Sequence, residues 1–238
     1  MIGQQSHAWL AGQLARAWGN PRFGPVEPRE EIVLGAAQHD LGWALADLAP
    51  RLNPDTRLPR SFVETTVAEH LAIWADAPDR LLTQSLCAAL VVSLHGCALS
   101  ELRSGRGGED TAPLLAHIAA EHARQAQLRA ALGLSTADSE RIQRQMWAWD
   151  SLSLALCNAW QPFIVRGVPA AEGPLDLELR QRDENLFVVD PWPFEGPRVE
   201  VRCEARELGE QDDEAAMREA LRRAAPVTLR FQLTPPRG

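Results

Sequence analysis

The sequence predicts a mainly α-helical protein that ends in a small antiparallel α+β unit. Apolar residues recur with the 3.6-residue period of a helix as far as about residue 162, and with the two-residue period of a strand after it. Hydrophobic residues make up 45% of the 238-residue chain, which is enough for a sizeable core. We therefore expect a helical domain over residues 1–165, with an antiparallel unit over residues 166–238 packed on it.

The first two expected helices each bring a histidine to their apolar side. Residues 5–18 place His7 on one face, and the segment GNPRFGP ends this helix. A second helix is expected over residues 28–43, because a proline followed by two glutamates is typical of a first helical turn. Its inner face carries Ile32, Ala36, His39 and Trp43. Asp40 follows directly, so this helix presents a His-Asp pair within an otherwise apolar segment.

The next two expected helices also hold one histidine each. The pattern SFVE is a capping box that begins a helix over residues 61–74, and this helix has His70 on its inner face. A further helix is expected over residues 78–103. Residues 85–99 are apolar almost all round, which indicates a central helix of the bundle, and His95 lies within it.

Two more helices complete the expected helical domain, and the second contains an aspartate. The first covers residues 113–133 and ends at a glycine. The second begins with a Ser-x-x-Asp pattern and covers residues 135–160. Asp150 lies in the middle of this helix. It shares a face with Met146, Leu154 and Cys157.

Alternation with a period of two marks the C-terminal unit. Leucines alternate with charged residues over residues 175–179, and apolar and charged residues alternate again over residues 199–205. An amphipathic helix is expected over residues 212–224, and VTLRFQL has the pattern of a last strand. The segment PWPFEGP predicts a turn packed on the bundle; a lid over a site or a contact in a homodimer remains an alternative.

Charge and composition disfavour several classes of protein. The net charge is −8, whereas a general nucleic-acid binder usually has a basic face. The chain has no lysine, which excludes a lysine nucleophile. Its four cysteines form no CxxC pair, so neither a disulfide framework nor a cysteine zinc site is expected. We find no signal peptide, and the most apolar run is short and contains His95, so we expect a cytoplasmic protein without a membrane span.

Six histidine and aspartate residues fall on or beside the inner faces of five expected helices. They are His7, His39, Asp40, His70, His95 and Asp150. A single buried histidine is more often a satisfied core residue than a ligand. Six such groups together would be costly to bury without a cation. Around one or two divalent ions they would form a complete shell, and imidazole with carboxylate suits Fe, Mn, Zn, Co or Ni.

The order H…HD…H…H…D resembles that of the HD-domain metallophosphohydrolase superfamily, and GAAQHDLGW is similar to the segment that carries its His-Asp doublet. DPWPFEGP and WDSLSLALC also resemble segments of an uncharacterised bacterial family. The resemblance implies an HD-domain-like helical bundle. It implies that one metal is held by His7, His39, Asp40 and Asp150. It implies that a second metal, where present, is held by Asp40, His70 and His95.

The resemblance implies a metal-dependent phosphohydrolase in which Asp40 is catalytic. The substrate would be a small phosphorylated or nucleotide-like molecule, bound at a mononuclear or binuclear site. Two other interpretations remain open. The same ligand order occurs in HD-type di-iron oxygenases, and a non-catalytic sensor domain that binds a metal or ligand would need the same residues. The identity of the bound metal would distinguish an oxygenase from a hydrolase, and the sequence does not determine which metal binds.

Overall fold

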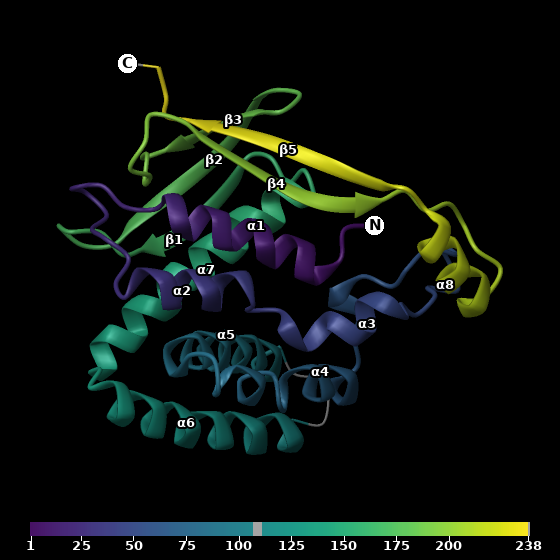
Figure 1. The fold of residues 1–238 in the computed structure, drawn as a ribbon, viewed down its shortest axis with the longest axis horizontal. Helices are drawn as coiled ribbons and strands as arrows, with labels where there is room; N and C mark the ends of the chain where they lie inside the picture. Colours follow the sequence, from purple (N-terminus) through teal and green to yellow (C-terminus); the bar gives the residue numbers. More distant parts are fainter. Residues whose placement is uncertain (107–110, 238) are drawn as a thin grey trace.

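The computed structural model describes residues 1–106 and 111–237 and has an α+β fold (Figure 1). Its α-helices are α1 (Gln4–Ala17), α2 (Arg29–Ala37), α3 (Ala44–Leu48), α4 (Val67–Trp74), α5 (Leu86–Ser104), α6 (Ala112–Leu132), α7 (Thr136–Cys157) and α8 (Glu214–Arg223). Its strands are β1 (Phe163–Val168), β2 (Leu175–Asp183), β3 (Leu186–Asp190), β4 (Val199–Arg206) and β5 (Pro226–Thr234). Short 3₁₀ turns are η1 (Leu41–Trp43), η2 (Phe62–Glu64) and η3 (Asp79–Leu81).

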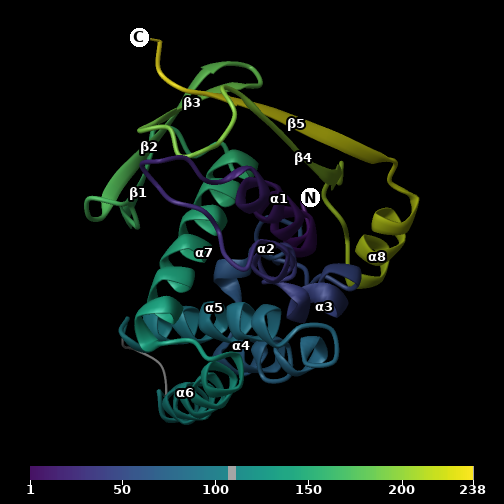
Figure 2. The same cartoon turned by 60° about the vertical axis from the view of Figure 1, so that its left-hand side comes forward.

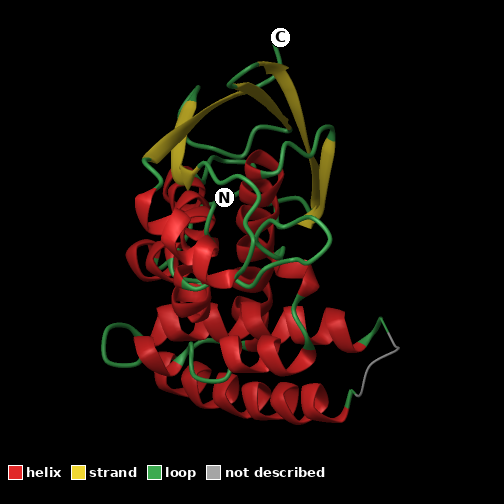
Figure 3. Cartoon of the chain, turned by 90° about the vertical axis from the view of Figure 1, so that its right-hand side faces the viewer, coloured by secondary structure: helices red, strands yellow, loops and turns green. Residues whose placement is uncertain are grey.

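The five strands form one mixed sheet in the order β1-β2-β3-β5-β4, and the sheet arches over the helices at one end of the molecule (Figure 3). Strand β5 inserts between β3 and β4, parallel to β3 and antiparallel to β4. The expectation of a mainly α, HD-domain-like bundle with an antiparallel C-terminal sheet is therefore wrong. Alternation along one strand shows which side chains face the core, but it does not show which strand will lie alongside.

The core is continuous between the helices and the sheet. Helix α1 packs against β4 and helix α7 against β1. At one end of α1, the fully buried ring of Trp18 makes edge contacts with Trp149 of α7 and Phe194 of the PWPFEGP segment, with ring centroids 5.9 and 5.5 Å apart. This segment therefore packs on the helices, as its sequence suggested. The contacts hold α1 and α7, which carry His7 and Asp150, in one rigid arrangement.

The expected helix over residues 28–43 is divided in the structure. Helix α2 ends at Ala37, and the chain turns before it continues as η1 and α3. After this turn Gly42 lets η1 lie against α4, because a Cβ at this position would lie 1.9 Å from the carbonyl oxygen of Ile73. Only glycine permits so close an approach of two backbones. His39 and Asp40 consequently lie in a turn rather than in the middle of a helix.

The expected helices over residues 61–74 and 78–103 both begin later than the sequence indicated. The SFVE box caps only η2, and a second capping box at Thr66 begins α4. Ser85 caps α5, which runs through the centre of the helical part. In the described part of the chain, α5 is the one helix whose length and hydropathy match a membrane span, and 67% of that stretch is buried inside the protein. Such burial is typical of a core helix.

Helix α8 lies at the side of the molecule, and α3 is the helix nearest to it in both views (Figures 1 and 2). The segment that leads into it is joined to the loop before η2, where the backbone N–H of Gln211 donates to the carbonyl oxygen of Arg57 at 2.9 Å. The C-terminal part of the chain thereby reaches the same side of the molecule as η1, α3 and the N-terminus.

Candidate metal centre

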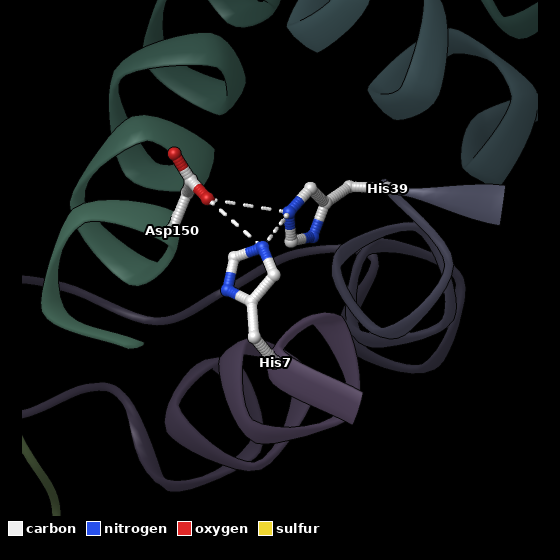
Figure 4. A group of neighbouring side chains, drawn as sticks. All are labelled: His7, His39 and Asp150. Carbon is white, nitrogen blue, oxygen red and sulfur yellow. Dashed lines mark hydrogen bonds and ion pairs between the residues drawn. The ribbon is translucent and has the colours of Figure 1, made fainter. Parts of the chain in front are cut away.

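Five of the six sequence-predicted ligands are gathered in the interior. His7 comes from α1, His39 and Asp40 from the turn after α2, His95 from the middle of α5 and Asp150 from the middle of α7. Each is buried, with at most 6% of its surface exposed. Figure 4 shows His7, His39 and Asp150 pointing toward one another from three separate segments. Four segments far apart in the sequence thus supply one cluster.

The central feature of the cluster is the convergence of four ligand atoms. The Nε2 atoms of His7 and His39 lie 3.2 Å apart. Asp40 Oδ2 is 2.9 Å from His7 Nε2 and 3.5 Å from His39 Nε2. Asp150 Oδ1 is 3.5 and 3.3 Å from the same two nitrogens. One oxygen of each carboxylate therefore lies within 3.5 Å of both histidine nitrogens.

Hydrogen bonds on the far side of each ring determine which ring nitrogen carries the proton. His39 Nδ1 lies 2.8 Å from the carbonyl oxygen of Ala36, which only accepts, so Nδ1 is the donor. The Ser153 hydroxyl donates to the carbonyl oxygen of Asp150, so its oxygen accepts from His7 Nδ1 at 2.7 Å. In the neutral form of either histidine, Nε2 therefore presents a lone pair to the centre.

Four acceptor atoms without a donor repel one another unless a proton or a cation lies between them. Burial lowers the pKa of His39, but the carboxylates of Asp40 and Asp150 outweigh this effect and raise it to about 9. Burial favours protonation of Asp150, yet its hydrogen bond to His39 and the surrounding histidines hold its pKa well below the usual range. Without a metal, the cluster therefore retains a proton on His39. A divalent cation fits the same donor set and would replace that proton.

His95 lies beside this set rather than at its centre. Its ring makes edge contacts with His39 and with Trp74, at centroid distances of 4.6 and 5.5 Å. One ligand atom each of His39, Asp40 and His95 lie within 4.8 Å of one another, and His39 also belongs to a second group with His7 and Asp150. Burial and the charge on His39 lower the pKa of His95 to about 4, so this ring is neutral near pH 7. It is available as a further nitrogen ligand.

His70 is not part of the cluster. Its Nε2 lies 2.9 Å from the hydroxyl oxygen of Ser100, whose own proton is donated to the carbonyl oxygen of Gly96. Nε2 therefore donates to Ser100. Trp74 stands between His70 and His95, with its ring in contact with both. The sequence suggested that Asp40, His70 and His95 hold a second metal. In this arrangement His70 does not join the other two.

A cavity of about 700 Å³ reaches the cluster at His7. Its walls come from the N-terminus, η1, α3, the loop before α4, α4 itself and the end of α7. This cavity could not be predicted from the sequence, because its walls come from segments that are far apart in the chain. It also did not single out Ser153, although the three-residue spacing from Asp150 places both on the same face of α7.

Comparisons with known proteins place the chain in a family but give no activity. A family model described as "Protein of unknown function (DUF3891)" matches residues 1–210. No curated protein and no solved structure matches the chain. The family model covers all the residues of the cluster, from His7 to Asp150. The chain thus belongs to the DUF3891 family of proteins of unknown function.

Proposed function

We propose that this protein binds one divalent metal ion through His7, His39, Asp40 and Asp150 and hydrolyses small phosphate esters. The observation that carries the proposal is the convergence of four acceptor atoms, with the proton of each ring held on the opposite side. Such an arrangement is unfavourable in a buried site unless a proton or a cation balances it, and the donor set suits a metal cation. Second hydrogen bonds of this kind are typical of histidines that bind a metal.

The donor set indicates which metals the site prefers. Two imidazole nitrogens and two carboxylate oxygens, without a thiolate, suit Fe, Mn, Zn, Co or Ni. When bound, such an ion supplies Lewis acidity, which lowers the pKa of water and neutralises charge on a phosphoryl oxygen. The order of the ligands along the chain resembles that of HD-domain metallophosphohydrolases, and this resemblance favours phosphate esters as the substrate class.

The remaining work falls to groups of the chain itself. Ser153 and the carbonyl oxygen of Ala36 fix the orientation of the two rings. Asp40 contacts the Nε2 atoms of both His7 and His39 and is also grouped with His95, and we assign it the role of orienting the attacking water. The cavity that reaches His7 has room for a small-molecule substrate. Hydrolysis adds the oxygen of water to phosphorus and releases the ester oxygen as an alcohol.

A mononuclear centre is favoured over a binuclear one, because none of the groups of neighbouring ligand atoms among the described residues includes His70. The di-iron oxygenase suggested by the ligand order would need a second complete shell. Metal analysis separates these cases: about one ion per chain supports the mononuclear centre, and two irons per chain contradict it. Stable metal binding without any hydrolysis would leave a sensor domain as the function.

The test measures metal content and phosphatase activity in protein purified without affinity-tag metal. We expect Asp40→Ala to lose both the metal and the activity toward a panel of phosphate monoesters. Asp76→Ala is the matched control, because Asp76 is exposed and pairs with Arg80 on the surface. It should keep both properties. Full metal content in Asp40→Ala, or no metal uptake by the unsubstituted protein, contradicts the proposal.

A further inference from the structure

The walls of the cavity that reaches His7 are largely apolar. Twelve of the 23 residues that line it are alanine, leucine, isoleucine, proline, phenylalanine or tryptophan, among them Trp43, Leu58, Phe62, Ala72, Ile73 and Leu154. They come from the N-terminus, η1, α3, the loop before α4, α4 itself, the end of α7 and the segment after β4. Leu58 is 39% exposed although it lines the cavity, so the apolar surface continues to the outside.

The charged residues that line the cavity are already engaged with other groups of the protein. Glu69 Oε1 lies 3.3 Å from Arg51 Nε and 3.4 Å from a guanidinium nitrogen of Arg60. Asp47 accepts a hydrogen bond at 3.1 Å from the backbone N–H of Gln5, at the N-terminus of α1. Two arginines and two acidic residues balance one another, and the N-terminal ammonium of Met1 donates to the carbonyl oxygen of Arg206, so the walls offer no cluster of unengaged cations for a second highly charged group such as a polyphosphate.

We propose that this cavity binds the apolar leaving group of the substrate, an alkyl or aryl phosphate monoester whose phosphate lies at the His7 end. The inference rests on the proposed function for the reaction. For the position of the apolar group it rests on the cavity alone. In the reaction the oxygen of water bonds to phosphorus, the bond between phosphorus and the ester oxygen breaks, and the alcohol leaves with a proton while inorganic phosphate is released.

The proposal predicts a dependence of kcat/KM on the length of the apolar group. Burial of one methylene is worth about 0.8 kcal/mol, which corresponds to about a fourfold change. Across a series of n-alkyl phosphates, kcat/KM should therefore rise about fourfold for each added methylene until the cavity is filled. A nucleoside monophosphate, whose base and sugar carry many polar groups, should be a poorer substrate than the longer alkyl phosphates.

Two substitutions in the wall should change this dependence in different ways. Phe62→Ala removes an apolar wall from η2 and should reduce the gain per methylene. Ala72→Phe adds volume inside the cavity and should bring the plateau to a shorter chain. Val63→Ala is the matched control, since Val63 is the neighbour of Phe62, is 65% exposed and does not line the cavity. It should leave the series unchanged.

The same series separates the cavity from the chemistry when non-hydrolysable alkylphosphonates are used as ligands in calorimetry. If no ester is hydrolysed but alkylphosphonates bind more tightly with each methylene, the hydrolase proposal fails and the cavity assignment stands. If esters are hydrolysed with a rate independent of chain length, or nucleoside monophosphates are the better substrates, the cavity assignment is overturned and the hydrolase proposal stands.

Discussion

The proton on His39 links metal binding to pH. In the metal-free protein the carboxylates of Asp40 and Asp150 raise the pKa of His39 to about 9, against burial, which lowers it. A metal ion needs the lone pair of Nε2 and must displace this proton. We expect the affinity for Zn²⁺ to rise about tenfold per pH unit up to about pH 9, with about one proton released per ion. Calorimetry in buffers of different ionisation enthalpy measures this release, and an affinity independent of pH between 7 and 9 would refute it.

The same pKa shift predicts how the stability of the metal-free protein depends on pH. The pKa of His39 is higher in the folded chain than its ordinary value of about 6.5, so protonation favours folding. This contribution is complete below about pH 6.5 and is lost as the pH rises through about 9. We expect a loss of roughly 2–3 kcal/mol in the free energy of unfolding across this range. Urea denaturation in the presence of a chelator measures it, and His39→Gln should flatten the slope.

Ser153 is expected to act on the metal through His7. Its hydroxyl oxygen accepts from His7 Nδ1 and so keeps Nε2 free for the cation. Loss of such a partner typically costs 10–100-fold in metal affinity. Ser153→Ala should therefore weaken metal binding by about this factor while the protein stays folded. Ser151→Ala, a buried serine on the same helix, serves as the control. Equal affinities in the two variants would show that the hydrogen bond to His7 has no such role.

At the scale of elements, the turn after α2 depends on its contact with α4. Gly42 lies so close to the carbonyl oxygen of Ile73 that an added Cβ would require the two segments to separate. Gly42→Ala should destabilise the protein by about 1–3 kcal/mol and move the His39–Asp40 turn. Thermal denaturation and metal content measure both effects. At Gly209 an added Cβ meets nothing within 4 Å, so Gly209→Ala should be close to neutral. A neutral Gly42→Ala would contradict this account.

Local patterns predicted the helices better than their ends. Helices α1, α6 and α7 agree closely with the expected ranges, because their apolar period is long and clear caps or glycines bound them. The segment over residues 28–43 has the same apolar period, yet it does not continue as one helix. Gly42 lies against α4 just after the turn, and helical spacing alone does not reveal such a contact.

At the scale of the whole molecule, the helices that carry the site depend on the sheet. Helix α1 packs on β4 and α7 on β1, so removal of the sheet exposes the buried faces of both. We expect a fragment of residues 1–165 to lose cooperative unfolding and metal binding together. Circular dichroism during heating and metal analysis test this expectation. A fragment that unfolds cooperatively and binds one metal ion would show instead that the helical part is an independent domain.

The sequence by itself determined which residues are candidates for the site. Histidine and aspartate at helical spacing on apolar faces are costly to bury, and this cost can be recognised along a single segment. Five of the six candidates do gather in the interior, where one oxygen each of Asp40 and Asp150 lies within 3.5 Å of the Nε2 atoms of His7 and His39. The helical and extended character of most segments was recognisable for the same reason, because periodicity is a local property.

Only the tertiary structure decided how these parts are joined. It inserted β5 between β3 and β4, turned His70 toward Ser100, and placed a cavity against His7. Each of these outcomes depends on contacts between segments far apart in the chain. The apolar period of a segment shows which of its faces is buried, but not which other segment packs against that face. The hydrogen bonds that fix the two ring protons are of the same kind. They depend on the relative positions of α1, α7 and the turn after α2, which the packed core alone sets.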